Sequence, residues 1–402
     1  MSAEVKPPGG GKSARSVLMI VHSYCPNDPR VRREAEAIAE RGDRVDVICL
    51  QDVGQRGRET IEGVTYWRLP LRRKRGGIAR YLFEYAALFA GAAALSIPLH
   101  LAHRYRLVQA HNMPDLLVFA GFFPWLSGAR LLLDLHDPVP ELYRAKFGMH
   151  PDALLIRVLS GIERAAIGFA DFAFAATGAF RSRLVERGRP QHRLGVLLNC
   201  PDARIFRPRA PDNGARDGLR LLFHGTVTER SGVDLAIRAA ERVRNQGMKL
   251  DLLIVGDGDF LPQIRDAAQE GDRAGWIEVR GAVALEEIPE IIATADLGLI
   301  PNRPGPFHEL ALPTRLFEYL VMDRPVLIAR SPAVSAIFPG DELLEFEPGD
   351  EEDLARAIER AHDPELRRRC ATRGGKIARE HLWENEKEIY LAVVDALLEP
   401  ER

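Results

Sequence analysis

Several features that would point to particular protein classes are scarce in this sequence. Its four cysteines, Cys25, Cys49, Cys200 and Cys370, are scattered, so neither a disulfide framework nor a metal-binding spacing of thiols is visible. Lys and Arg number 55 against 57 Asp and Glu, for a net charge of -2, and this balance argues against nucleic acid as a main partner. These absences favour a cytoplasmic protein with reduced thiols.

Long uninterrupted hydrophobic runs are also missing. The most apolar segment, residues 81–101, is broken by Glu84, Pro98 and His100, which argues against a membrane span. The basic run Arg72–Arg75 precedes it, so residues 72–101 form either a solvated loop and a core helix, the favoured interpretation, or a peripheral contact with the inner face of a membrane. Residues 1–15 have no apolar stretch of the signal-peptide kind and are predicted to be a disordered tail.

What the sequence does contain is a repeated alternation of short apolar runs and helical patterns. At 402 residues and 46% hydrophobic content, it is long enough for two domains. Alternation of this kind predicts α/β domains with parallel, doubly wound sheets. Expected strands are 16–22, 44–50, 107–111, 129–135, 172–176, 219–223, 250–255, 277–279 and 297–300, with helices at 31–41, 233–245 and 382–398 among those between and after them.

A polar stretch rich in Pro and Gly, residues 208–218, divides this alternation into two halves of similar size. The predicted domains are therefore 16–210 and 211–381, both Rossmann-like, with a final segment, 382–402, whose helix packs back on the first domain. Ligands of such sheets bind beyond the carboxyl ends of the strands. If the two sheets face each other, the site lies in the cleft between the domains.

The stretch from Phe307 to Pro325 predicts an anion-binding helix end. Pro313 suits a first helical position, where no amide donor is needed. The free amides of Thr314 and Arg315 would then present the positive end of the helix dipole to a phosphate. Glu318 lies on the same face, where its carboxylate can accept hydrogen bonds from two ribose hydroxyls. We therefore expect a nucleotide sugar at this helix end.

Four stretches of the sequence carry a family resemblance: Asn27–Ala35, Ala110–Asp115 with Asp134–Asp137, His224–Asp234 and Leu312–Pro325. In this order they resemble the large bacterial family of retaining, nucleotide-sugar-dependent glycosyltransferases with the GT-B fold (group 1, or family 4 type). The resemblance implies two facing Rossmann-like domains and transfer of a sugar, from a UDP-sugar by default and a GDP-sugar as the alternative, to a hydroxyl of a glycan, lipid-linked or small-molecule acceptor. It also implies that no metal or other cofactor is needed.

This chain departs from the family pattern in its phosphate- and sugar-binding motifs. The family has two glutamates separated by seven residues, whereas here Leu310 takes the first position, Glu309 lies one residue away and Glu318 keeps the second. Where the family has an Arg and a Lys after Gly225, this chain has Thr226 and Ser231. A diphosphate in a desolvated cleft still needs a cation, and Arg230 is the nearest candidate.

The resemblance and the strand ends together predict the site residues. His136 ends an apolar strand, and in the family a histidine there contacts the donor sugar, so His136, Arg230 and Glu318 are the expected catalytic residues. The Asp257–Asp259 turn is interpreted as a loop and not a metal site. Expected donor-binding residues are Gly225, Thr226, Arg230, Gly256, Gly258, Val283, Thr314, Arg315 and Glu318, and expected acceptor-side residues are Asn27, Arg30, His111, Asn112, Asp137 and Glu141.

Two other functions fit parts of the pattern. A nucleotide-sugar epimerase would share the two-lobed architecture but needs an acid and a base at the sugar, and no clear pair is visible. A non-catalytic sugar-nucleotide-binding protein would explain why Leu310 replaces a glutamate. The sequence leaves the acceptor and the oligomeric state open.

Overall fold

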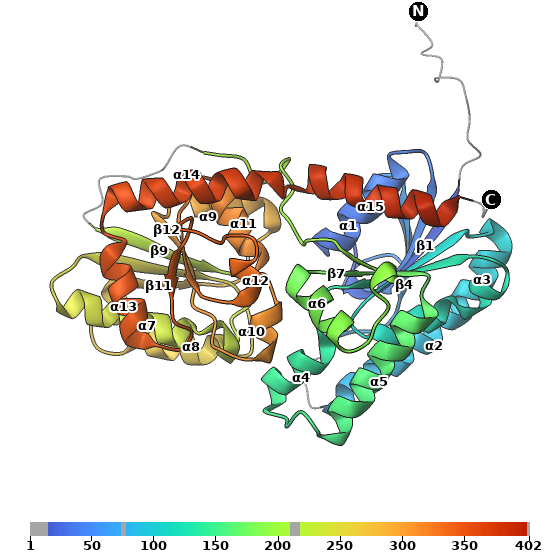
Figure 1. Cartoon of the computed structure of the whole chain (residues 1–402), viewed down its shortest axis with the longest axis horizontal. Helices are drawn as coiled ribbons and strands as arrows, with labels where there is room; N and C mark the ends of the chain where they lie inside the picture. The colour runs from blue at the N-terminus through green and yellow to red at the C-terminus, as the bar shows by residue number, and fades with distance from the viewer. Residues whose placement is uncertain (1–14, 74–77, 210–217, 400–402) are drawn as a thin grey trace, which may run out of the picture.

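The computed structural model describes residues 15–73, 78–209 and 218–399. It has two α/β lobes, each built on its own sheet, as Figure 1 shows. Strand runs such as Val17–Val21 are buried on both faces, which is the environment of parallel strands covered by helices. The predicted two-domain α/β architecture is confirmed.

The N-terminal lobe contains an eight-stranded sheet in the order β3-β4-β2-β1-β5-β6-β7-β8, parallel except for β3. Its strands are β1 (Ser16–Tyr24), β2 (Arg44–Leu50), β3 (Arg58–Ile61), β4 (Val64–Leu69), β5 (Leu107–His111), β6 (Arg130–Leu135), β7 (Phe172–Ala175) and β8 (Leu194–Val196). Its helices are α1 (Pro29–Ala39), α2 (Ile78–His103), α3 (Phe122–Leu126), α4 (Val139–Phe147), α5 (Leu154–Phe169) and α6 (Gly178–Glu186), with 3-10 turns η1 (Asp115–Gly121) and η2 (Gln191–Arg193).

The C-terminal lobe contains a six-stranded parallel sheet in the order β11-β10-β9-β12-β13-β14, the strand order of dinucleotide-binding folds. Its strands are β9 (Leu219–His224), β10 (Leu250–Val255), β11 (Ile277–Arg280), β12 (Leu297–Ile300), β13 (Val326–Ala329) and β14 (Leu344–Phe346). Its helices are α7 (Val233–Asn245), α8 (Leu261–Gln269), α9 (Ile288–Ala293), α10 (Pro306–Leu310), α11 (Thr314–Val321), α12 (Pro332–Ser335), α13 (Glu351–Arg360) and α14 (Pro364–Glu380), with 3-10 turns η3 (Glu229–Ser231), η4 (Arg273–Gly275) and η5 (Leu285–Glu287).

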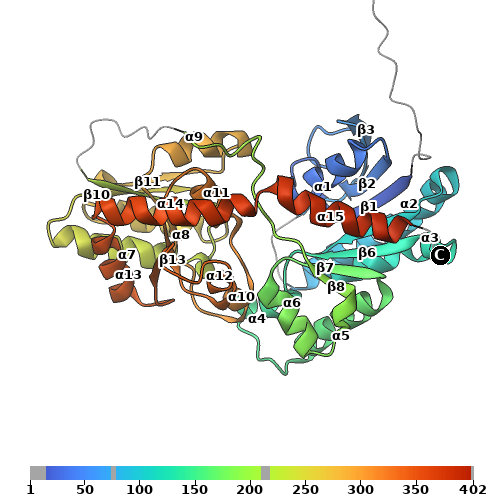
Figure 2. The same ribbon diagram turned by 45° about the horizontal axis from the view of Figure 1, so that its top comes forward.

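The chain passes between the lobes twice. It leaves the first lobe after β8 and returns to it after α14, as helix α15 (Trp383–Leu398), which lies along the N-terminal lobe in both views (Figures 1 and 2). Trp383, Tyr390 and Val394 of α15 are buried in the same core cluster as residues of β1 and α1. Burial of large apolar side chains is what holds this helix on the lobe.

Local differences from the sequence prediction have identifiable causes. Helix α1 begins at Pro29, two residues earlier than predicted, because the Asp28 side chain accepts hydrogen bonds from the amides of Arg30 and Val31. Pro313 is the extended residue before α11 and not its first helical residue. The predicted tail and the break at 208–218 lie largely outside the described residues. Strands β3, β4, β8, β13 and β14 were not predicted.

Candidate functional site

A cavity of about 490 Å³ lies between the two lobes. The N-terminal lobe lines it with Arg30, His136 and Asp137, and the C-terminal lobe with residues of the loop after β9 and of the start of α11. A second cavity of about 170 Å³ adjoins it, shares Pro29, Asn199 and Thr314, and contains Glu318. The carboxyl ends of β6 and β9 therefore open toward one interdomain space, the position that ligands of such sheets occupy.

The start of α11 presents backbone amides to this space. Thr314 and Arg315 are its first two residues and both line the larger cavity. Amides at these positions have no intrahelical acceptor, and they carry the positive end of the helix dipole. The opposite face of α11 is anchored by Phe317 and Leu320, which are buried in the core of the lobe. This helix end therefore offers a fixed binding surface for an anion.

Two arginines face the same space without a carboxylate partner among the residues that the structure describes. The Arg315 guanidinium lies against Gly225, donates from Nη1 to the carbonyl of His224 at 2.7 Å, and stands 4.5 Å from the centre of the Phe223 ring. The Arg230 guanidinium lies 5.3 Å from the centre of the Phe307 ring. Burial lowers the pKa of both groups, and Arg230 lowers that of Arg315 further, so the pair is poised for a multiply charged anion.

Glu318 is a mostly buried carboxyl group, and Arg315 and Arg33 lower its pKa by less than burial raises it. Burial raises its pKa to about 7. The nearest ring atom, His224 Nε2, lies 3.3 Å away, but burial and Arg315 lower the pKa of His224 to about 3, so the imidazole is neutral. The oxygens of Glu318 are therefore free to accept hydrogen bonds from hydroxyl groups of a ligand in the smaller cavity.

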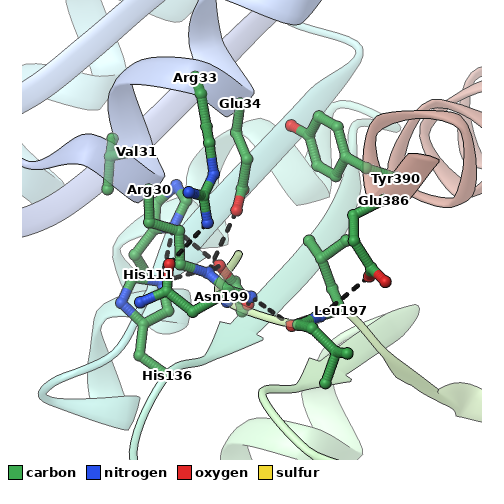
Figure 3. A network of polar contacts seen from close by, with 12 residues as sticks. Arg30, Val31, Arg33, Glu34, His111, His136, Leu197, Asn199, Glu386 and Tyr390 are labelled. Atoms are coloured by element: carbon green, nitrogen blue, oxygen red, sulfur yellow. Dashed lines mark hydrogen bonds and ion pairs between the residues drawn. The ribbon is translucent and has the colours of Figure 1, made fainter. Parts of the chain in front are cut away.

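His136 is held from behind by a buried ionic network (Figure 3). Its Nε2 lies 2.8 Å from Asp134 Oδ2, and Arg30 donates to both oxygens of Asp134, at 2.6 and 2.8 Å. Although burial alone would raise it, Arg30 and the two histidines hold the pKa of Asp134 well below its usual range. His111 Nδ1 also contacts Asp134, at 3.2 Å. His136 thus reaches the cavity with one ring nitrogen fixed by a charged partner.

The same three side chains, His111, Asp134 and His136, are the one group among the described residues whose ligand atoms are close enough to hold a metal ion. Here the atoms are at hydrogen-bond distances from one another, and both oxygens of Asp134 already bind Arg30. A guanidinium so close would repel a divalent cation. The group is better described as a hydrogen-bonded support for His136.

Asn112 positions the loop that carries His136. Its Oδ1 accepts from the amides of His136 and Asp137 at 2.7 and 3.2 Å, and its Nδ2 donates to the Asp137 carbonyl at 2.8 Å. Asn112 and His111 are buried and do not line either interdomain cavity, so their predicted contact with an acceptor is corrected to a supporting role.

Other predicted residues also lie away from the cavities. Glu141 is fully buried, pairs with Arg187 and lines a separate cavity between α4 and α5 and neither interdomain cavity, so its contact with an acceptor stays a prediction. Asn27 and Val283 line neither interdomain cavity. A Cβ on Gly256 or Gly258 would lie within 1.9 Å of a backbone oxygen of the Gly225–Val227 loop, so these glycines act by letting two loops pack together.

The residues at the first glutamate position are now placed. Leu310 is buried and lines the larger cavity, and its carbonyl accepts a hydrogen bond from Thr177 Oγ1 at 2.7 Å. Glu309 is exposed, lies 3.9 Å from Arg183 and lines neither cavity. Glu309 therefore does not take the place of the missing glutamate.

Of the predicted donor and catalytic residues, Thr226, Arg230, Thr314 and Arg315 line the larger cavity with His136, and Glu318 lines the smaller one. Sequence reasoning missed the side chain of Arg315, which was assigned only an amide, and Asn199, which lines both cavities from the segment that joins the lobes. It also missed the pairing of Arg30 with Asp134. No local sequence pattern marks these contacts, because each depends on the folding of distant segments.

Comparisons with known proteins give a consistent result. The Glycosyl transferases group 1 family matches residues 218–363, and the Glycosyl transferase 4-like domain family matches residues 28–200. Alpha-D-kanosaminyltransferase from Streptomyces kanamyceticus is 26% identical over 268 residues, which are 63% of this chain and 67% of that enzyme. The amylovoran biosynthesis glycosyltransferase AmsK from Erwinia amylovora is 28% identical over 148 residues, which are 34% of this chain and 36% of that enzyme.

Solved structures share the fold. Sucrose-phosphate synthase from Thermosynechococcus elongatus superposes with a TM-score of 0.76 at 17% identity, covering 95% of this chain and 100% of that one. Anabaena HepE in complex with UDP-glucose superposes with a TM-score of 0.71 at 16% identity, covering 95% and 99%. Because the two family matches span both lobes and the neighbours share the whole fold, the chain belongs to the group 1 glycosyltransferases of the GT-B fold.

Proposed function

We propose that the protein transfers a sugar from a UDP-sugar to an acceptor hydroxyl with retention of anomeric configuration. The observation that carries this proposal is the placement of the α11 amino end, Arg230 and Arg315 around one interdomain cavity, with Glu318 in the cavity that adjoins it. The solved neighbour with UDP-glucose supports UDP as the nucleotide of first choice. GDP remains the alternative.

The chemistry follows from where charge develops. Breaking the bond between the anomeric carbon and the phosphate leaves negative charge on the departing diphosphate, and fixed donors aimed at that charge are the largest source of catalysis in such sites. In this protein the donors are the amides of Thr314 and Arg315 and the guanidinium groups of Arg230 and Arg315. His136 faces the sugar from the other lobe. In the proposed front-face reaction a diphosphate oxygen takes the proton of the acceptor hydroxyl.

A divalent cation is not part of the proposal. The two arginines and the helix end already supply positive charge at the diphosphate position, and an arginine fork binds two phosphate oxygens at once. Sugar transfer is therefore expected to proceed at the same rate with and without a chelator such as EDTA.

The test of the donor site compares Glu318, the second glutamate of the family motif, with Glu309, which lies one residue from the first motif position. We expect Glu318→Ala to weaken UDP binding at least tenfold in calorimetry, because it removes the carboxylate that accepts from the ribose hydroxyls. Glu309→Ala removes the same group from an exposed position outside both cavities and should leave UDP affinity unchanged. Equal affinity of the wild type and Glu318→Ala for UDP would contradict the assignment.

The reaction itself is tested by its products. The protein is incubated with a panel of nucleotide sugars and simple acceptors, and the anomeric configuration of the new linkage is read by NMR. A retained configuration supports the proposal. An epimerised donor without transfer would instead indicate the epimerase, and binding without any turnover would indicate the non-catalytic alternative that Leu310 left open.

We further propose that the enzyme works in the cytoplasm, with α2 resting on the inner membrane face. Residues 80–103 are long and apolar enough to cross a membrane by length and composition, with a mean hydropathy of 1.6 in their most apolar window. Leu88 and Ala92 are nevertheless buried in the core of the lobe, whereas Leu82 and Phe83 are exposed, as are Arg72 and Arg73 earlier in the sequence. A half-buried helix with an exposed apolar and basic margin suits an anionic lipid surface.

A further inference from the structure

A separate cavity of about 460 Å³ lies in the N-terminal lobe, between α4 and α5. Helix α4 stands between it and the interdomain cavity: Ala145 faces the interdomain side, and Glu141 and Arg144 face this one. Its size falls within the range of small-molecule sites. The cavity therefore borders the half of the cleft where an acceptor would bind.

The lining of this cavity is dominated by four arginines, Arg144, Arg164, Arg187 and Arg189. Two of them are neutralised by buried carboxylates, because Arg187 pairs with Glu141, and Arg189 lies 3.2 Å from Glu163. Arg144 and Arg164 have no carboxylate within ion-pair distance among the described residues. Arg144 is partly buried and Arg164 is exposed, so the lining of the cavity carries two solvent-accessible positive charges that no carboxylate of the described residues balances.

Buried donors in this cavity also lack acceptors. Arg189 is only 8% exposed, and its Nε has no hydrogen-bond partner among the described residues, as is true of the Nε of Arg144. Leaving such donors buried and unpaired costs free energy. These two nitrogens are closed to solvent, so an anion in the cavity would bind the terminal nitrogens of Arg144 and Arg164 and would lower this cost through its charge.

We propose that the cavity between α4 and α5 is a subsite for a phosphate or diphosphate group of the acceptor. Guanidinium groups bind phosphate oxygens in pairs, and the charge of the lining matches a dianion. The lining contains no aromatic side chain on which a nucleobase would stack. Assigning the phosphate to the acceptor rests on the proposed transferase function, whereas anion binding by the cavity does not.

A chain of contacts joins this subsite to the loop that presents His136. Glu163, the partner of Arg189, lies beside Asp115, and burial together with Glu163 raises the pKa of Asp115 to about 7. Asp115 accepts a hydrogen bond from Asn112 at 2.9 Å, and Asn112 holds the backbone of His136. A phosphate in the cavity would therefore lie against the support of the loop that faces the donor sugar.

The phosphate could belong to a lipid or to a soluble sugar phosphate. Leu154 and Val158 project into solvent one turn apart on α5, the helix that supplies Ile156 and Ser160 to the cavity wall. A prenyl chain attached to the phosphate could lie along them. A lipid phosphate and a soluble sugar phosphate would bind the arginines in the same way, and only the lipid would also contact Leu154 and Val158.

The experiment is a calorimetric titration with inorganic pyrophosphate and, separately, with geranyl diphosphate, each in the presence of saturating UDP so that the proposed donor site is already filled. Four proteins are compared: wild type, the double variant Arg144→Gln/Arg164→Gln, the control Arg157→Gln and the donor-site variant Arg230→Gln. Arg157 is exposed on α5 and does not line the cavity. Arg157→Gln therefore removes one positive charge from the helix that carries Arg164 and leaves the cavity lining unchanged. Neither Arg144 nor Arg164 has a carboxylate partner, so the double variant should fold, which thermal unfolding verifies.

We expect the double variant to bind pyrophosphate at least tenfold more weakly than wild type, with unchanged UDP affinity, and Arg157→Gln to bind as wild type. Tighter binding of geranyl diphosphate would assign the group to a lipid, and equal binding to a soluble phosphate. Unchanged pyrophosphate affinity in the double variant, an equal loss in Arg157→Gln, or a loss in Arg230→Gln alone would overturn the subsite. If wild type bound pyrophosphate through Arg144 and Arg164 but did not bind UDP, the subsite would stand and the proposed donor function would fail.

Discussion

Glu318 has a proposed ligand-binding role, and ionisation of its buried carboxyl group lowers the free energy of unfolding of the unliganded protein. Its pKa of about 7 lies above the ordinary value of 4.5, because burial disfavours the charged form by more than Arg315 and Arg33 favour it. Between these two values the folded protein keeps a proton that the unfolded chain has released. The contribution of Glu318 to the free energy of unfolding therefore falls as the pH rises through this window.

This predicts a pH-dependent difference between wild type and Glu318→Gln. The amide cannot ionise, so the variant should gain stability relative to wild type on going from pH 4.5 to pH 8, by up to about 3 kcal/mol from a shift of this size. Urea unfolding of both proteins across this range gives the measurement. A difference that stays constant with pH would show that the carboxyl titrates normally.

In the proposed mechanism, Arg230 and Arg315 take the place of the Arg and Lys that the family resemblance implies near Gly225. We expect Arg230→Gln and Arg315→Gln each to lower kcat by about 100-fold, the effect of removing one donor to developing negative charge. Arg230→Lys keeps the charge but loses the fork, so its kcat should lie between those of wild type and Arg230→Gln. The measurement is steady-state kinetics with a UDP-sugar. A wild-type kcat in both glutamine variants would contradict the assignment of the donor diphosphate to these two arginines.

The residue scale is where sequence reasoning reached least far. Arg230 was predicted because it is next to Ser231, where the resembled family has a lysine. Glu318 was predicted because it occupies the position of the second glutamate of the family motif. The ion pair of Arg30 with Asp134 joins residues more than a hundred positions apart, so only the sheet brings them together. Glu141 lies outside the interdomain cavities because a helix presents successive residues to different faces, and the short stretch after β6 did not show which face meets the cleft.

At the scale of elements, α2 has one face in the lobe and another in solvent. We expect Phe83→Glu to abolish co-sedimentation with vesicles containing phosphatidylglycerol, because Phe83 is 66% exposed and would be the deepest apolar contact with the lipid. Val53→Glu is the control, since Val53 is 75% exposed and lies in the loop after β2, away from α2 in the sequence. Activity on a soluble acceptor should be unchanged in both variants. Binding of Phe83→Glu to such vesicles at the wild-type level would exclude this contact.

Elements with strong periodicity were predictable from sequence. Helix α7 and strands β2, β10 and β12 have the predicted bounds because their apolar runs are flanked by Gly, Pro or polar turns. Strands β3 and β4 form a hairpin at the sheet edge. In β3 the exposed Arg58 and Thr60 alternate with the partly buried Glu59 and Ile61, so the apolar signal is weak. Strands β8 and β14 have three residues each, too few to show a period.

At the scale of the whole molecule, the lobes touch directly as well as through the chain. Thr177 at the start of α6 donates its hydroxyl to the carbonyl of Leu310 in the other lobe, and the same oxygen accepts from the amide of Phe180. The contact lies beside the cavity, because Thr177 and Leu310 both line it. It therefore links closure of the lobes to the shape of the donor site.

We expect Thr177→Val to favour a more open arrangement and to raise the KM for the UDP-sugar about fivefold, the effect of losing roughly 1 kcal/mol of hydrogen bonding. Thr177→Ser keeps the hydroxyl and should behave as wild type. Small-angle scattering with and without UDP reports the opening directly. If Thr177→Val had the same radius of gyration and KM as wild type, this hydrogen bond would have no part in closure.

Helix α15 gives the protein a particular order of assembly. Its side chains complete the hydrophobic cluster beneath β1 and α1, and Arg15, ahead of β1, pairs with Asp395 near the end of α15. During synthesis the hydrophobic cluster of the first lobe stays partly exposed to solvent until the entire second lobe and α15 have been translated. A nascent chain halted after α14 should consequently bind chaperones through its first half, although that half contains every strand of its sheet.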